Sequence, residues 1–115
     1  MNNKRKIIND PVFGFINIPK GLLYDIVRHP IVQRLNRIKQ MGLSFVVYPG
    51  AQHTRFQHSL GAYHLMQQAI TQLAAKGNFI FDSEAEAVKI AILTPCDFSI
   101  SKLSKTPSLI LTSLE

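Results

Sequence analysis

Three of the chain's four histidines lie within one short stretch, "HTRFQHSLGAYH", from His53 to His64, together with one arginine. Neutral imidazole is a common ligand for transition metals, and a guanidinium group binds phosphate. These residue types therefore point to a metal and phosphate site. The alternative is an ordinary helix start with polar side chains on its surface, and the residues alone leave both interpretations open.

A helix is predicted to begin inside this stretch. Thr54, followed three residues later by Gln57, forms a capping box that places Thr54 at the N-cap. Arg55 and His58 then lie three residues apart on the helix, so both side chains reach the same surface patch. The free N–H groups and the positive dipole of a helix start also suit an anionic ligand.

The other two histidines of the stretch are not expected to join His58. His64 lies six residues further along the helix and points to a different side, whereas His53 precedes the helix in a loop. A metal ion needs several ligands that converge on one point. The spacing therefore leaves His58 as either a metal ligand or a hydrogen-bonded polar residue.

The segments before this stretch must position it, and they predict a short β-hairpin or extended arm followed by helices. Residues 9–19, "NDPVFGFINIP", alternate around Pro and Gly, as hairpins do. Apolar spacing predicts a helix in "KGLLYDIVRHP" that stops at Pro30, and another in "IVQRLNRIKQMG" that stops at Gly42. The next segment, "LSFVVYPGAQ", is typical of a strand or a buried loop that ends in a turn.

Two longer helices are predicted after it. The helix that follows Thr54 should end at Gly77-Asn78, and a second capping box at Ser83 and Glu86 predicts a helix over "EAEAVKIAIL". Pro95 should stop that second helix near Thr94. The buried face of the first helix is predicted to carry Phe56, Leu60, Tyr63, Ile70 and Leu73. The fold class expected from these patterns is mainly α.

Composition limits the function classes. With 115 residues, 46% hydrophobic and 17% charged, the chain is one small globular domain or part of a larger one. The sequence has no apolar run near the ~18 residues that a membrane helix needs, and the single Cys96 fits a reducing cytoplasm. Residues 1–40 hold eight Lys and Arg against Asp10 and Asp25. That excess is either a phosphate-attracting patch or a solvated basic face.

The run "NDPVFGFINIPKGLLYDIVRHPIVQRLNRIKQMGLSFVVYPGAQHTRFQHSLGAYHL" resembles the N-terminal part of HD-domain phosphohydrolases, which include deoxynucleoside triphosphate triphosphohydrolases. The resemblance extends from about Lys6 to Leu93. It implies an all-α core whose divalent metal is held by a His, a His-Asp doublet and a distant Asp. By that resemblance, His58 is a metal ligand, Arg55 contacts the substrate phosphate, and Gln40 contacts the sugar. The implied reaction is metal-assisted hydrolysis of a nucleotide or another phosphate ester, such as a dNTP.

The chain departs from this family after residue 93. Relatives continue with a run like L-H-D-I-G-H-G-P-F-S-H, but this chain has "TPCDFSISKLSK" and no histidine after His64. Cys96-Asp97 is the nearest substitute for the doublet. We therefore expect residues 1–93 to be the N-terminal part of the HD domain and residues 94–115 to be a divergent tail. A reading-frame shift or a truncated gene model is the expected origin, with true divergence as the alternative, and the chain alone is predicted to be inactive.

Further departures concern specificity and regulation. Many relatives carry His where this chain has Phe13. Nucleotide-regulated relatives read a guanine effector with an acidic residue and an Arg, at positions that are Arg28 and Asn36 here. Gln33 is retained, but the two changes argue against that regulation.

Two non-catalytic functions are alternatives. The chain could pair with an HD-family subunit or with itself, because apolar surface around residues 88–93 is expected to lack its usual cover. It could also bind nucleic acid through its basic N-terminal third, although the sequence has no aromatic and basic stacking platform. The predicted partners are thus a nucleotide or other phosphate ester and a second copy of the chain, without a membrane.

Overall fold

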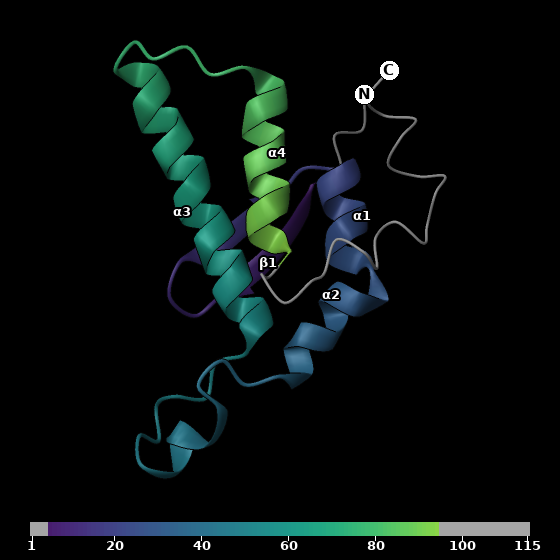
Figure 1. The fold of residues 1–115 in the computed structure, drawn as a ribbon, viewed down its shortest axis with the longest axis vertical. Helices are drawn as coiled ribbons and strands as arrows, with labels where there is room; N and C mark the ends of the chain where they lie inside the picture. Colours follow the sequence, from purple (N-terminus) through teal and green to yellow (C-terminus); the bar gives the residue numbers. More distant parts are fainter. Residues whose placement is uncertain (1–4, 95–115) are drawn as a thin grey trace.

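The computed structural model describes residues 5–94, and it confirms a mainly α fold with an N-terminal β-hairpin. Figure 1 shows the hairpin and two short helices beside a pair of long helices, α3 and α4, which pack against each other. The core lies where the hairpin, the short helices and this pair meet. Its buried apolar members are Ile16, Ile18, Leu23, Val27, Val32, Leu35, Phe56, Leu60, Tyr63 and Leu93.

The hairpin is built from β1 (Lys6–Asp10) and β2 (Gly14–Ile18), which pair antiparallel with Lys6 opposite Ile18 and Asp10 opposite Gly14. It therefore begins three residues before the predicted range. Asp10 Oδ1 accepts hydrogen bonds from the N–H groups of Val12 (2.9 Å) and Phe13 (3.1 Å). Gly14 closes the loop at φ +72°, a left-handed conformation that only glycine adopts without strain.

Two short helices follow, α1 (Leu22–Arg28) and α2 (Pro30–Arg34). Pro30 ends the first, as predicted, and also begins the second, because proline lacks only an N–H that the first helical turn leaves unpaired. The helix predicted to run to Gly42 is wrong in length. It passes into a 3-10 turn, η1 (Leu35–Arg37), and Ile38 is extended. Ile38 and the residues after it pair instead with the start of α3, a tertiary contact that overrides the local periodicity.

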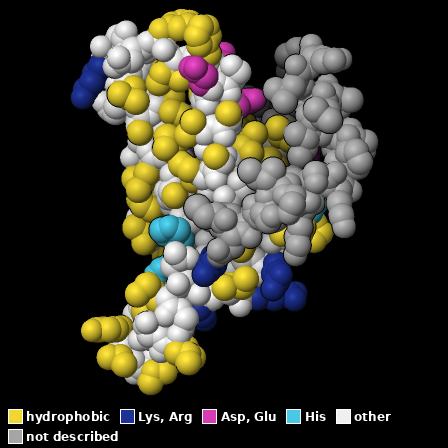
Figure 2. All heavy atoms as spheres, in the orientation of Figure 1, with side chains coloured by type: hydrophobic (Ala, Val, Ile, Leu, Met, Phe, Trp, Pro, Cys, Tyr) yellow, Lys and Arg dark blue, Asp and Glu magenta, His cyan; other side chains and the backbone are white. Residues whose placement is uncertain are grey.

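The prediction of a strand or buried loop after Gly42 is also wrong. Residues 42–46 form a second 3-10 turn, η2 (Gly42–Val46), and the apolar side chains around it are exposed. Leu43, Val46, Val47 and Tyr48 are 78%, 72%, 73% and 67% exposed. This segment projects away from the helices in Figure 1, and its apolar tips form the lower end of the molecule in Figure 2.

Helix α3 (Arg55–Ala75) has the predicted capping box. The Gln57 N–H donates to Thr54 Oγ1 (3.2 Å), and the Thr54 N–H donates to Gln57 Oε1 (2.8 Å). The helix ends as predicted before Gly77, which has φ +87°. Its predicted buried face is confirmed only at the first turns: Phe56, Leu60 and Tyr63 are buried, but Leu73 is 45% exposed and Ile70 is only partly covered.

Helix α4 (Asp82–Leu93) ends with Thr94 as its C-cap, as Pro95 predicts. Its start differs from the prediction, since Phe81 rather than Ser83 is the N-cap and the Phe81 N–H donates to Glu84 Oε2 (3.3 Å). Asp82 and Glu84 then place negative charge in the first turn, where the helix dipole favours it. Within residues 5–94, the structure has no helix that is long and apolar enough to cross a membrane.

Candidate functional site

The start of α3 brings the predicted site residues together. Lys39 and Thr54 form an isolated antiparallel bridge, in which the Gln40 N–H donates to His53 O (3.1 Å) and the Arg55 N–H donates to Ile38 O (2.9 Å). Lys39 Nζ adds a hydrogen bond to Gln52 O (2.8 Å). The bridge therefore places the segment around Gln40 beside Arg55, with His58 one helical turn further along.

The backbone at this helix start is less open to an anion than the sequence suggests. The Arg55 N–H donates to Ile38 O, and the Gln57 N–H donates to Thr54 Oγ1, as the predicted capping box requires. The helix dipole still favours negative charge here. A bound anion would therefore depend on side chains, and Arg55 supplies a partly buried guanidinium group at this position.

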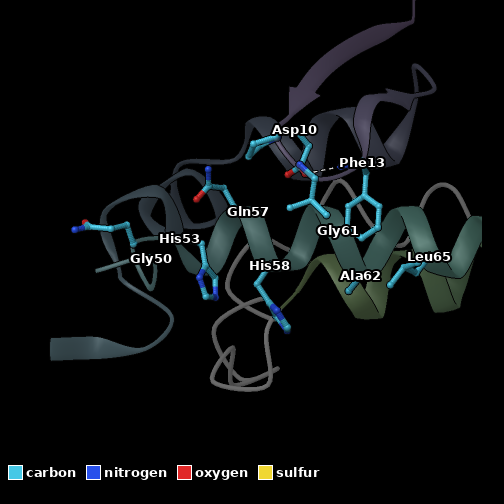
Figure 3. A pocket seen from close by; sticks show the side chains of 12 residues that line it. Asp10, Phe13, Gly50, His53, Gln57, His58, Gly61, Ala62 and Leu65 are labelled. Atoms are coloured by element: carbon cyan, nitrogen blue, oxygen red, sulfur yellow. Dashed lines mark hydrogen bonds between the residues drawn. The ribbon is translucent and has the colours of Figure 1, made fainter. Parts of the chain in front are cut away.

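A cavity of about 670 Å³ opens beside the helix start, within the size range of small-molecule sites. Figure 3 shows the His53 and His58 side chains pointing to the same side of it. Neither Arg55 nor Gln40 lines this cavity. It is lined by Asp10, Pro11, Val12, Phe13, Gly50, Gln52, His53, Gln57, His58, Gly61, Ala62 and Leu65.

His64 faces elsewhere, as its spacing from His58 predicts. Its ring lies against Phe13, with the ring centroids 5.1 Å apart, and it lines a separate cavity with Gln67 and Gln68. His53 was expected only to lie in a loop. The structure places it beside His58 at the cavity, a pairing that depends on the path of the loop before α3.

The sequence analysis did not name several other cavity residues as site residues, for two different reasons. Gly61, Ala62 and Leu65 follow His58 at helical spacings of three, four and seven residues, so the periodicity could have identified them. Asp10 and Phe13 come from the hairpin turn, far away in the sequence. No local signal indicates that this turn packs on α3.

The electrostatic character of the region favours an anion. The sequence has no acidic residue between Asp25 and Asp82. In Figure 2 the acidic side chains lie where α4 begins, and most of the basic ones visible on this face lie at the opposite end. Asp10 is the carboxylate at the cavity, and it is buried with one oxygen accepting two backbone N–H groups. The acid-free segment carries Arg28, Arg34, Arg37, Lys39, Arg55 and Lys76. Such a charge balance attracts phosphates.

The residues present do not complete a metal centre. Within residues 5–94, no three His, Cys, Asp or Glu side chains lie close enough together to hold a metal ion. His58 and His53 offer two imidazoles, and a catalytic metal in proteins usually has three or more protein ligands. The suggested substitute doublet, Cys96-Asp97, lies outside the described residues.

Comparison with known sequences identifies relatives of the chain. No family model matches it. The deoxynucleoside triphosphate triphosphohydrolases SAMHD1 of Bos taurus and Homo sapiens are each 40% identical over 91 residues, which is 79% of this chain but 15% and 14% of theirs. Protein YwfO of Bacillus subtilis is 33% identical over 91 residues, 21% of its length.

Solved structures agree with these relatives. A phosphohydrolase from Bacteroides thetaiotaomicron is 84% identical with a TM-score of 0.76, over 78% of this chain and 22% of that one. A protein from Aquifex aeolicus is 37% identical with a TM-score of 0.66 over the same shares. The chain thus spans about a fifth or less of the length of these relatives. Together with the "HTRF-x-HSLG" motif at the start of α3, these similarities show that 79% of the chain resembles part of the HD-domain phosphohydrolases.

Proposed function

We propose that the chain binds a phosphate ester at the start of α3, and that a nucleotide, a dNTP in particular, is the first candidate. Two observations support the proposal: the segment between Asp25 and Asp82 contains Arg55 and no acidic residue, and a cavity lies beside His58. Arg55 contacts the phosphate and Gln40 contacts the sugar in this proposal. The SAMHD1 relatives are deoxynucleoside triphosphate triphosphohydrolases, which supports the choice of substrate.

The reaction we propose for the intact protein is phosphohydrolysis with a divalent metal ion, for which His58 is one ligand. The family resemblance supports this proposal. The described residues do not complete the metal centre, so we propose that this chain binds its ligand without turning it over. Cys96-Asp97 and the rest of residues 95–115 could alter that only by supplying the ligands that residues 5–94 lack.

The test separates binding from turnover in the purified chain. Binding of dATP should be measurable by calorimetry and should weaken with salt, whereas deoxyadenosine, which lacks the charge, should bind far more weakly. With Mg²⁺ or Mn²⁺ added, release of phosphate or triphosphate should stay at the level of a protein-free blank. Metal-dependent release that His58→Ala abolishes would contradict the proposed inactivity, and absence of dATP binding would contradict the proposed ligand.

Self-association is the second proposed function, as a module that pairs with a second copy or with another HD-family subunit. The exposed apolar side chains of the segment around η2 favour it. Of the stretch 88–93, which was expected to lack cover, Val88 is 41% exposed, but Leu93 is buried in the core. Exposed apolar side chains that gather on one segment, as they do around η2, mark interaction sites. Sedimentation velocity at two protein concentrations should show a concentration-dependent increase in mass. A chain that stays monomeric at both concentrations would contradict self-association, and only pairing with a different subunit would remain.

Two further properties remain predictions. Nucleic-acid binding through the basic surface should show a steep loss of affinity with salt, and it ranks below nucleotide binding because the surface lacks a stacking platform. The cytoplasm is the compartment we propose, because the nucleotide substrate class and the single cysteine both fit it.

A further inference from the structure

The cavity changes character along α3. His58, Ala62 and Leu65 follow one another on the same face of the helix at intervals of four and three residues, and all three line the cavity. At a rise of 1.5 Å per residue, His58 and Leu65 lie about 10 Å apart along the axis. The end near the helix start is polar, with His53 beside His58, and the end one to two turns later is apolar.

The opposite wall of the apolar end comes from the hairpin turn. Figure 3 shows the Phe13 side chain directed toward α3 beside Gly61. A Cβ atom at Gly61 would lie 2.9 Å from Phe13 Cε2, which is closer than carbon atoms normally approach. Glycine at this position therefore allows the Phe13 ring to pack against the helix. The ring also contacts His64, and 36% of the Phe13 surface stays exposed.

We propose that Phe13 is a specificity-determining residue, which holds a flat aromatic group of a phosphate ester whose phosphate lies at the start of α3, beside Arg55, His53 and His58. This inference rests on the phosphate-ester binding proposed above. Because Phe13 faces Gly61, which is three residues or about 4.5 Å along the axis from His58, one small ester can reach both places with its charged head and its ring. Val12 and Leu65 supply further apolar surface at the ring end, and an aromatic side chain pairs favourably with a ligand ring.

Charge also fixes the direction of the ligand. Asp10 lies in the hairpin wall of the cavity together with Phe13, and its carboxylate repels a phosphate placed there. The imidazoles of His53 and His58 and the positive end of the α3 dipole favour a phosphate at the other end. An ester therefore binds with its ring toward Phe13.

Two probes of equal charge test this proposal in the full chain, phenyl phosphate and methyl phosphate. We expect phenyl phosphate to bind about tenfold more tightly, since an aromatic pair and the buried ring area add to the phosphate contact. Titrations followed by NMR should show His58 resonances shifting with both esters, but Phe13 and Leu65 resonances shifting only with phenyl phosphate. Inorganic phosphate should behave as methyl phosphate does.

Substitutions at Phe13 and Phe15 test whether the preference for phenyl phosphate depends on the Phe13 ring. Phe13→Ala should reduce the ratio of the two affinities to near one, with methyl phosphate unaffected. Phe15→Ala is the matched control, because Phe15 lies in β2, is 71% exposed and does not line the cavity, so the ratio should be retained. If Phe13→Ala fails to fold by circular dichroism, Phe13→Leu keeps the apolar bulk without the ring and should lower the ratio.

The outcomes separate this inference from the proposed function. Equal affinities for phenyl and methyl phosphate, or a preference for phenyl phosphate that survives loss of the Phe13 ring, overturn the role of Phe13 and leave phosphate binding intact. Failure of both esters and of dATP to bind overturns both proposals together. A preference that depends on Phe13 and not on Phe15 supports the inference.

Discussion

Arg55 and His58 lie one helical turn apart, but their surroundings give them different roles. The Arg55 side chain is partly buried and its backbone N–H is tied to Ile38, so its position is fixed by the bridge between residues 39 and 54. His58 is exposed at the cavity. A partly buried guanidinium group on a fixed backbone is suited to orient a phosphate, because its planar donors bind anionic oxygens in a defined geometry.

Replacing Arg55 should therefore weaken ligand binding. Arg55→Ala is expected to lower dATP affinity at least tenfold, since hydrogen bonds to a charged group contribute about 1.5–3 kcal/mol. Arg55→Lys should recover only part of the loss. The matched control is Lys76→Ala, which removes one exposed positive charge beyond the far end of α3. Equal losses for Arg55→Ala and Lys76→Ala would indicate a general charge effect without a specific contact.

Tyr63 gives the folded chain a dependence on alkaline pH. Burial raises the pKa of the Tyr63 hydroxyl above its ordinary value of 10.0, although the hydrogen bond from Gln67 Nε2 (2.7 Å) acts in the opposite direction. The folded state therefore holds this proton more tightly than the unfolded state. The associated stability is present below pH 10 and is lost as the pH rises from there toward the folded-state pKa.

Urea denaturation at pH 9 and pH 11 measures this effect. The free energy of unfolding should fall between the two pH values by more in the wild-type chain than in Tyr63→Phe, which has no proton to lose. At pH 9 the variant should be less stable by about 1 kcal/mol, because the hydrogen bond with Gln67 is removed. An identical pH dependence in both proteins would rule out Tyr63 as its source.

At the scale of elements, the start of α3 is fixed by its cap. Thr54→Ala removes the side-chain acceptor of the Gln57 N–H and should lower the free energy of unfolding by about 1 kcal/mol. Ser83→Ala is the control, because Ser83 lies inside the first turn of α4 and is not its N-cap, so its effect should stay within about 0.5 kcal/mol. Thermal or urea unfolding of both variants decides this. A larger effect at Ser83 would show that the two caps have been assigned wrongly.

These two threonine and serine positions also show what the sequence can predict. Both precede a Glu or Gln by three residues, yet only Thr54 caps a helix, because α4 begins two residues earlier than predicted, at Asp82. Local signals also located the break at Pro30 and the end of α3 before Gly77. Local signals did not predict the structure where segments that are distant in the sequence contact each other. The Lys39–Thr54 bridge shortens the helix that was predicted to run to Gly42. The hairpin turn forms one wall of the cavity, and no local sequence pattern indicates this.

At the scale of the whole molecule, polar and apolar surfaces are unevenly distributed. The acid-free segment between Asp25 and Asp82 includes both the candidate site and the exposed apolar residues around η2. The site therefore lies between a basic surface and an apolar projection. The aligned part makes up only 22% of each solved relative, so further chain is available there to contact such surfaces, which fits our proposal that the site is incomplete in this chain.

The composition after Thr94 leads to the last prediction. The matched relatives align over 91 of the 115 residues, and 22 residues from Thr94 onward form a Ser- and Thr-rich string without helical periodicity. Gradual loss of function would erode the expected His-Asp and Gly-His-Gly run residue by residue, whereas a frame shift replaces it at once. We propose that residues 94–115 are not homologous to the family.

The coding DNA around codon 93, translated in all three forward frames, tests this directly. We expect one alternative frame to restore a His-Asp doublet followed by Gly-His-Gly and to stay open well beyond codon 115. The physical consequence is measurable as well: a chain rebuilt in that frame should bind a divalent metal ion more tightly than the present chain does, because the doublet would add ligands that converge with His58. If neither alternative frame encodes the doublet, the tail is genuine, and Cys96→Ala and Asp97→Ala become the variants that show whether this pair replaces it.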